Sequence, residues 1–175
     1  MTRRETASQT AGPFVHIGLL PEAAGLASPF GRATAGPRLW TDDTPGERIV
    51  IEGQVLDGEG APLTDVLVEI WQTDLAFSAW GRSAVATDTG LFRFETIKPQ
   101  VAFISVFILA RGINLGLHTR LYFEDEVAAN AADPVLNRIE PAVRRSTLIA
   151  RLQAPGSYRF DIRLQGEAET VFFDL

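Results

Sequence analysis

Near its end the sequence reads Tyr158-Arg159-Phe160-Asp161-Ile162-Arg163-Leu164. Apolar and charged residues alternate strictly in this stretch, which is the period of a β-strand with one face buried and the other in water. This is the clearest alternation in the whole chain. It predicts a half-buried strand, and it favours strands wherever weaker patterns of the same kind occur.

Shorter patterns of this kind fill much of the chain, at residues 48–56, 66–72, 92–96, 117–123, 148–152 and 170–173. The run from Val101 to Leu109 is almost continuously apolar and predicts a strand buried on both faces. Residues 124–132 are rich in alanine and begin with acidic residues, which predicts one short helix. Seven or eight short strands separated by turns such as Asp57-Gly58 predict an all-β fold, an antiparallel β-sandwich.

Residues 1–45 differ in composition and in apolar pattern from the rest of the chain. Glycine and proline recur there, as in Gly12-Pro13 and Gly36-Pro37, and apolar periodicity is weak. We therefore expect an irregular, extended N-terminal arm over residues 1–45 that contacts a partner chain and becomes ordered in the complex. Residues 46–175 are expected to form the sandwich domain.

Composition excludes several classes of protein. The 175 residues suit a single domain, and 16 basic against 22 acidic residues give a formal charge of −6. This charge argues against binding to nucleic acid or to an anionic membrane. The absence of cysteine excludes disulfides, thiolate nucleophiles and iron–sulfur clusters. No apolar run resembles a secretory signal or a membrane span, so we expect a cytoplasmic protein.

Residues that bind metals are scarce. The chain has two histidines, His16 and His118, and two tyrosines, Tyr122 and Tyr158, and no two of them have the close spacing of metal ligands. A metal site made by this chain alone is therefore not expected. His118 lies in a strand pattern, where a structural role is the commoner one, and His16 is expected to make a packing or turn contact in the arm.

Arg111 is the candidate binding residue that the pattern itself singles out. It directly follows the apolar segment 101–110. A guanidinium at the end of a buried strand needs an anion, because an unpaired charge there is costly. Two partners remain open at this point: an internal Asp or Glu, or the carboxylate of a substrate, which a guanidinium can bind through two parallel hydrogen bonds.

Three segments carry a resemblance to a known family. They are residues 8–18 (SQTAGPFVHIG), residues 110–123 (ARGINLGLHTRLYF) and residues 158–167 (YRFDIRLQGE). Together with shorter matches from about residue 9 to the end, they resemble the intradiol ring-cleavage dioxygenases. Within that family the likeness is to the alpha chains of heteromeric members. The resemblance implies a prealbumin-like β-sandwich.

The resemblance also implies a function. Alpha and beta chains would form a hetero-oligomer that cleaves protocatechuate (3,4-dihydroxybenzoate) with O₂ to 3-carboxy-cis,cis-muconate. Arg111 matches an arginine that approaches the substrate carboxylate. The residues that match an arm lining the pocket are Thr10, Gly12, Pro13 and Phe14. No catalytic residue is expected in this chain.

The cofactor implied by the resemblance is Fe(III), bound by the partner beta chain. The family binds this iron with two tyrosines and two histidines, and the histidine positions fall on Phe103 and Ser105 here. The tyrosine positions fall in short connections after Gln72 and Pro99 that hold no tyrosine. We therefore expect no metal ligand in this chain.

A second hypothesis comes from a different class of protein. The spacing of Gly53, Val55, Asp57, Pro62 and Leu63 is also similar to that of transthyretin-like domains, which would make the chain a non-catalytic β-sandwich binding module. A homologous partner chain that carries tyrosine and His-x-His ligands would favour the enzyme subunit. A chain that purifies alone as a stable, colourless monomer would favour the module.

Overall fold

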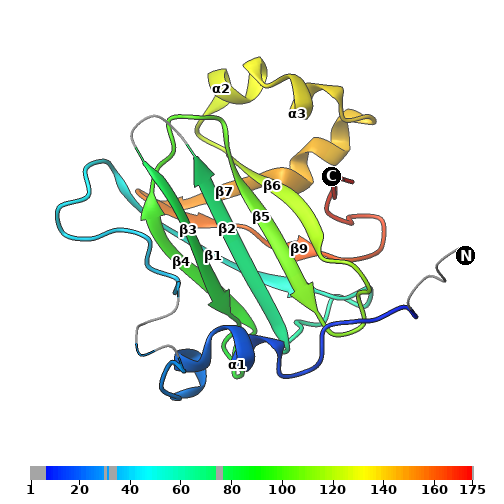
Figure 1. Ribbon diagram of the computed structural model, residues 1–175. Coiled ribbons are helices and arrows are strands. Elements are labelled where there is room, and N and C mark those ends of the chain that lie inside the picture. Colours follow the sequence, from blue (N-terminus) through cyan, green and yellow to red (C-terminus); the bar gives the residue numbers. More distant parts are fainter. Residues whose placement is uncertain (1–6, 30, 32–34, 74–76, 175) are drawn as a thin grey trace, which may run out of the picture.

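A computed structural model describes residues 7–29, 31, 35–73 and 77–174 of the chain. Nine strands dominate it, with short helices at both ends of the strands (Figure 1). The elements follow in the order α1 (Val15–Leu19), η1 (Pro21–Ala24), β1 (Arg48–Leu56), β2 (Val66–Thr73), β3 (Ser78–Ala84), β4 (Leu91–Ile97), β5 (Phe103–Ala110), β6 (Leu117–Phe123), α2 (Val127–Ala132), α3 (Pro134–Arg138), η2 (Ala142–Leu148), β7 (Ile149–Ala154), β8 (Ser157–Arg159) and β9 (Ile162–Arg163).

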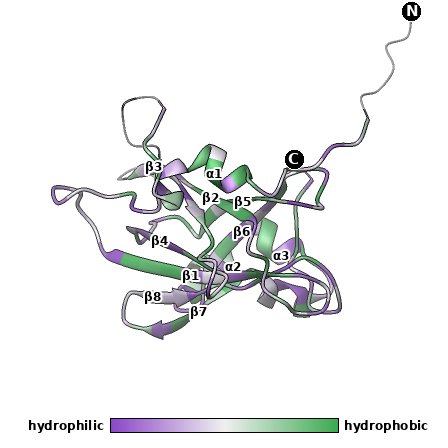
Figure 2. Ribbon diagram, turned by 90° about the horizontal axis from the view of Figure 1, so that it is seen from below, coloured by the Kyte–Doolittle hydropathy of each residue, from purple (hydrophilic) through white to green (hydrophobic). Residues whose placement is uncertain are grey.

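The strands form an open β-sandwich, which confirms the predicted fold class. They are hydrogen-bonded in the order β3-β2-β5-β6-β7-β8-β1-β4, and β9 pairs with β1. This path bends so that its two halves face each other. The core between them takes buried residues such as Val68 and Ile108 from β2 and β5, and Ile49 and Phe94 from β1 and β4. Hydrophobic stretches, drawn in green, run along β1, β2 and β5 (Figure 2).

The strand predicted at residues 101–109 is present as β5, but the prediction that both its faces are buried is wrong. Ile104, Val106 and Ile108 are fully buried in the core. Phe103 and Phe107, which point to the opposite face, are only half-buried. The continuous apolar run therefore supplies one face to the core, and its other face leaves aromatic groups on the outside of the sandwich.

The stretch that alternates most clearly is divided into β8 and β9. Tyr158, Phe160 and Ile162 are buried as the alternation predicts. The ladder is interrupted at Asp161, because its Oδ1 accepts a hydrogen bond from the backbone N–H of Gln54 at 3.0 Å and so replaces a strand partner. Both pieces run parallel to β1, and β6 is parallel to β7, whereas the other pairs are antiparallel.

Besides bounds that shift by one or two residues, three elements differ from the sequence prediction. β3 was not predicted, and residues 170–173 form no strand because their backbone groups bond to several separate partners, including Thr147 and His118. The predicted helix begins only at Val127, and α3 follows it directly. Asp133 caps α3, since its Oδ1 accepts from the N–H groups of Val135 at 2.9 Å and Leu136 at 2.7 Å.

The described parts of the N-terminal arm lie on the chain's own sandwich. The backbone of residues 37–39 pairs with Glu95, whose N–H donates to Pro37 O and whose carbonyl accepts from Leu39 N, both at 2.9 Å. Leu20 and Pro21 are buried beside α1. The contact of the arm with a partner chain stays a prediction, as does the boundary at residue 45. Among the described residues, no helix is long and apolar enough to cross a lipid bilayer.

Candidate functional site

The arm is anchored beside Arg111 by the hydroxyl of Thr10. Its Oγ1 accepts a hydrogen bond from the backbone N–H of Gly112 at 2.8 Å and lies 3.0 Å from the carbonyl oxygen of Ile113. Gly112 has a φ of +91°, a backbone conformation that glycine adopts without the steric cost of a side chain. The structure thus places Thr10 beside the neighbour of Arg111, although these two predicted site residues lie 101 positions apart in the sequence.

Arg111 finds its anion within the chain, in Asp65. The Nε of Arg111 lies 2.8 Å from Oδ2 of Asp65. The register of the β2–β5 ladder accounts for this pair, because Val66 faces Ala110 and the next position along each strand brings Asp65 opposite Arg111. Sequence reasoning left the partner open and did not identify Asp65, since the register was not known.

The ion pair leaves most of the guanidinium free. The Arg111 side chain is 63% exposed, whereas that of Asp65 is 18% exposed. An exposed pair of this kind contributes roughly 0–1 kcal/mol to stability, so its main effect is on orientation. Because Asp65 contacts the Nε, the edge formed by the two terminal nitrogens remains able to pair with a second carboxylate.

The other predicted arm residues lie between Thr10 and α1. The Gly12 carbonyl accepts from the N–H of Val15 at 3.1 Å, which turns the chain into the helix. Pro13 is exposed, and the Phe14 side chain is 72% exposed. No contact described in the structure joins Gly12, Pro13 or Phe14 to Arg111, and their role in a pocket stays a prediction.

The positions of the family's histidines lie on the outer face of the sandwich. Phe103 and Ser105 stand on β5, where Ser105 faces Trp71 on one side and Arg120 on the other. Neither residue offers an imidazole. Within the described ranges, no three His, Cys, Asp or Glu side chains come close enough together to hold a metal ion. The donor set here does not fit the iron on which the family depends.

The two tyrosines are committed to internal hydrogen bonds. The Tyr122 hydroxyl donates to Asp133 at 3.1 Å, and burial raises the pKa of Tyr122 to about 12. The Tyr158 hydroxyl donates to Asp125 at 2.8 Å, and burial likewise raises its pKa. A tyrosine that binds a metal does so as the phenolate, and both environments favour the neutral phenol.

A shallow cavity of about 260 Å³ lies on the same outer face. His118 is part of its lining, and its ring lies against Phe107 with 4.5 Å between the ring centroids. Glu69, also in the lining, is bound by the Nε of Arg82 at 2.6 Å. The imidazole thus packs against an aromatic ring and the carboxylate is bound by Arg82, and the structural role expected for His118 stays a prediction.

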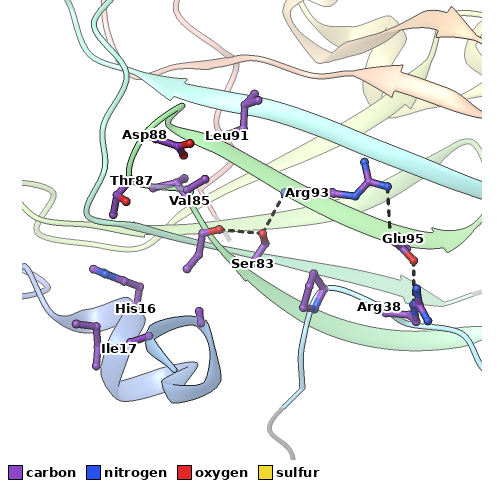
Figure 3. Close-up of a pocket in the computed structure, with 15 residues that line it drawn as sticks. His16, Ile17, Arg38, Ser83, Val85, Thr87, Asp88, Leu91, Arg93 and Glu95 are labelled. Carbon is purple, nitrogen blue, oxygen red and sulfur yellow. Dashed lines mark hydrogen bonds and ion pairs between the residues drawn. The ribbon is translucent and has the colours of Figure 1, made fainter. Parts of the chain in front are cut away.

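A larger cavity of about 750 Å³ lies between α1 and the β3–β4 hairpin (Figure 3). His16 lines one side, and its Nδ1 is buried without a hydrogen-bond partner in the described part of the chain. On the other side Glu95 pairs with Arg38 at 2.9 Å and Arg93 at 3.4 Å (Figure 3). Sequence reasoning did not identify this cavity. Glu95 pairs with both of its arginines, and Arg93 pairs with Glu52 as well. Among the described residues of the lining, no nucleophile is hydrogen-bonded to a base.

Comparison with known proteins identifies the family of the chain. The family described as Dioxygenase (Dioxygenase_C) matches residues 31–102. The protocatechuate 3,4-dioxygenase alpha chain of Pseudomonas putida is 48% identical over 195 residues, covering 97% of this chain and 96% of that protein. The chain belongs to the protocatechuate 3,4-dioxygenase alpha-chain family.

Two further relatives place this alpha-chain family among the intradiol dioxygenases. The protocatechuate 3,4-dioxygenase beta chain of Burkholderia cepacia is 29% identical over 161 residues, covering 71% of this chain and 67% of that protein. The dioxygenase domain of a carbohydrate-binding fusion protein from Streptomyces sp. SirexAA-E matches with a TM-score of 0.55 and 27% identity, over 78% of this chain and 89% of that one. The resemblance seen in the sequence is therefore confirmed, and the transthyretin-like module is not favoured.

Proposed function

We propose that this chain is the alpha subunit of a hetero-oligomeric protocatechuate 3,4-dioxygenase. In the proposed complex the beta chain holds the iron, and this chain shapes the pocket and binds the carboxylate of the substrate. The observation that carries the proposal is the pairing of Arg111 Nε with Asp65, with the Arg111 side chain still 63% exposed next to the arm that Thr10 anchors.

The chemistry of this chain is positioning. Protocatechuate carries one carboxylate on its ring, and two parallel hydrogen bonds from Arg111 would fix both the place and the plane of that group. Fixing the ring in one orientation would present its two hydroxyl-bearing carbons, between which O₂ cleaves the ring to give 3-carboxy-cis,cis-muconate, to the partner chain. Residues 10–14 would cover the ring and exclude water, which can contribute several kcal/mol when the geometry is tight.

The surface of the chain supports an obligate partner. Trp71 is 50% exposed on the outer face of β2, and Phe14 and Leu115 are 72% and 79% exposed at the arm and at the β5–β6 loop. Phe103 and Phe107 add half-buried aromatic rings to the outer face. Exposed aromatic and aliphatic groups of this kind are typical of an interface, and a homologous beta chain is the partner that the family relation favours.

The first test removes the guanidinium in the assembled enzyme. Co-expression with a beta chain should give a complex that contains iron and consumes O₂ with protocatechuate. In that complex Arg111→Ala should weaken the use of protocatechuate by about 1.5–3 kcal/mol, the range for a charge-assisted hydrogen bond, or roughly ten- to a hundredfold in kcat/KM. Steady-state kinetics of O₂ uptake measure this change.

Two controls separate binding from folding. Catechol lacks the carboxylate, so its slower turnover should change much less in Arg111→Ala than that of protocatechuate. Arg111→Lys should restore only part of the activity, because an ammonium group cannot bind two carboxylate oxygens in one plane. If both substrates lose activity equally, Arg111 acts only through its pair with Asp65, and the proposed contact with substrate is wrong.

A further inference from the structure

A cavity of about 440 Å³ lies away from the candidate site, where η2, β7, the β8–β9 segment and the C-terminal segment meet. None of its residues belongs to the Arg111 site or to the arm. Its lining consists of Ser146, Thr147, Ile149, Arg151, Gln153, Arg159, Phe160, Asp161, Arg163, Ala168 and Thr170. The volume is in the range of sites that bind small molecules.

Positive charge gathers in this cavity although the chain as a whole has a formal charge of −6. Three arginines and one aspartate are among its lining residues, which leaves two positive charges in excess. Arg151 stands directly opposite Arg159 in the β7–β8 ladder. Like charges in this position repel each other across the two strands, so nearby negative charge stabilises the pair.

The chain supplies that charge to one of the three arginines. Arg159 pairs with Asp161 at 2.7 Å and donates to Oε1 of Gln54 at 3.0 Å. In the part of the chain that the structure describes, the side chains of Arg151 and Arg163 make no hydrogen bond or ion pair. Both arginines lie on strands, and a strand holds the backbone of a residue more firmly than a loop does.

A buried hydroxyl completes the lining. Thr170 is 1% exposed, and its Oγ1 accepts a hydrogen bond from the backbone N–H of Arg163 at 2.9 Å. Among the described residues nothing accepts the proton of this hydroxyl, so it remains a donor at the wall of the cavity. The lining therefore presents donors from Arg151, Arg163 and Thr170, and its one carboxylate is already neutralised.

We propose that this cavity binds a compact anion with two or more negative charges, such as inorganic phosphate or a small polycarboxylate. Guanidinium groups match the oxygens of both kinds of anion, and two unpaired guanidiniums favour a multivalent anion over chloride. The proposal is independent of the proposed function, because it concerns a different set of residues.

The test is calorimetric titration of the alpha/beta complex with phosphate and, separately, with tricarballylate, at constant ionic strength set by sodium chloride. We expect saturable binding with one anion bound per alpha chain. Whichever of phosphate and tricarballylate binds more tightly shows whether the cavity prefers phosphate or a polycarboxylate. Arg151→Gln and Arg163→Gln should each weaken binding at least about tenfold, the effect of losing a charge-assisted hydrogen bond. Turnover of protocatechuate should not change.

The matched control is Arg138→Gln, which removes an exposed arginine of α3 outside the cavity. Its affinity for both anions should equal that of the wild type. Three results would overturn the proposal: no saturable binding of either anion, the same loss of affinity in Arg138→Gln as in Arg151→Gln, or affinity unchanged in both cavity variants. A partner chain that already fills the cavity would give the first of these results.

Discussion

Lys98 is the only lysine of the sequence, and its side chain is buried directly after the end of β4. Its Nζ donates to the Tyr158 hydroxyl at 2.6 Å and to both carboxylate oxygens of Asp125 at 2.9 Å, and its side chain is 8% exposed. Burial alone would lower the pKa of Lys98, but the hydrogen bonds and Coulomb attraction of Tyr158 and Asp125 outweigh it and raise the pKa. The charged form is therefore the stable one in the fold.

Replacing Lys98 should reduce stability by an amount that depends on pH. Lys98→Met should cost on the order of 2 kcal/mol near pH 7, because the charged hydrogen bonds to Asp125 and Tyr158 are lost. Burial of Asp125 favours its neutral form, but the hydrogen bonds from Lys98 and Tyr158 lower its pKa below 3.8. A depressed carboxylate pKa stabilises the fold above pH 4, and this contribution is lost as the pH falls through the folded-state pKa.

Urea unfolding from pH 7 to pH 2.5 measures this effect. The difference between the wild type and Lys98→Met should be largest near pH 7 and should shrink below about pH 4. Arg138→Met, which replaces an exposed cation, should track the wild type at every pH. A difference between the wild type and Lys98→Met that does not vary with pH would show that the methionine only disturbs packing.

Thr10 should affect catalysis through the position of the arm. Thr10→Val keeps the shape of the side chain but removes the hydroxyl that accepts from Gly112 and lies against the Ile113 carbonyl. The arm would then lose its anchor beside Arg111, and kcat/KM of the complex should fall by about three- to tenfold, the effect of one ordinary hydrogen bond. Ser8→Ala, an exposed neighbour, is the control and should leave kcat/KM unchanged. An equal loss in both variants would mean that the anchor has no role in positioning.

β1 and the β8–β9 segment approach each other closely at Gly53. A Cβ at this position would lie 1.8 Å from the carbonyl oxygen of Phe160 and 2.6 Å from the ring of Phe92. Because backbone on one side cannot move away, Gly53→Ala should destabilise the chain by about 1–3 kcal/mol or more. Thermal unfolding measures the change. Gly18→Ala in α1, where nothing lies within 4 Å of the added carbon, should be neutral or slightly stabilising.

The sequence was sufficient to predict strands whose pattern is local. β1 and β6 have the predicted bounds, and in β1 the alternation also determines which face is buried. β3 was missed because the stretch Ala79-Trp80-Gly81-Arg82 has no alternation, and its pairing with β2 decides its conformation. Arg111 was recognised as needing an anion, but its pair with Asp65 depends on the register of two strands, which no local pattern contains.

The side chains that this chain offers as metal ligands predict that iron will be found in the complex and not in the isolated chain. The isolated chain should be colourless and hold far less than one iron atom per chain, because both tyrosines are held as neutral phenols and Phe103 and Ser105 offer no imidazole. Co-expression with a beta chain should give a coloured complex with iron close to one per alpha/beta pair. Elemental analysis and the visible spectrum of both preparations test this, and stoichiometric iron in the isolated chain would contradict it.

The path of the strands also has a consequence during synthesis on the ribosome. β1 lies between β4 and β8, and Val50 faces Ser157, which is translated 107 residues later. At 5–20 residues per second, β1 must wait roughly 5–20 s for this neighbour. During that time one edge of β1 has no hydrogen-bond partner in a nascent chain that is otherwise largely made, which is the condition in which strands aggregate. The parallel pairing that completes the sandwich thus makes production of this chain sensitive to elongation rate and to chaperones that shield unpaired strands.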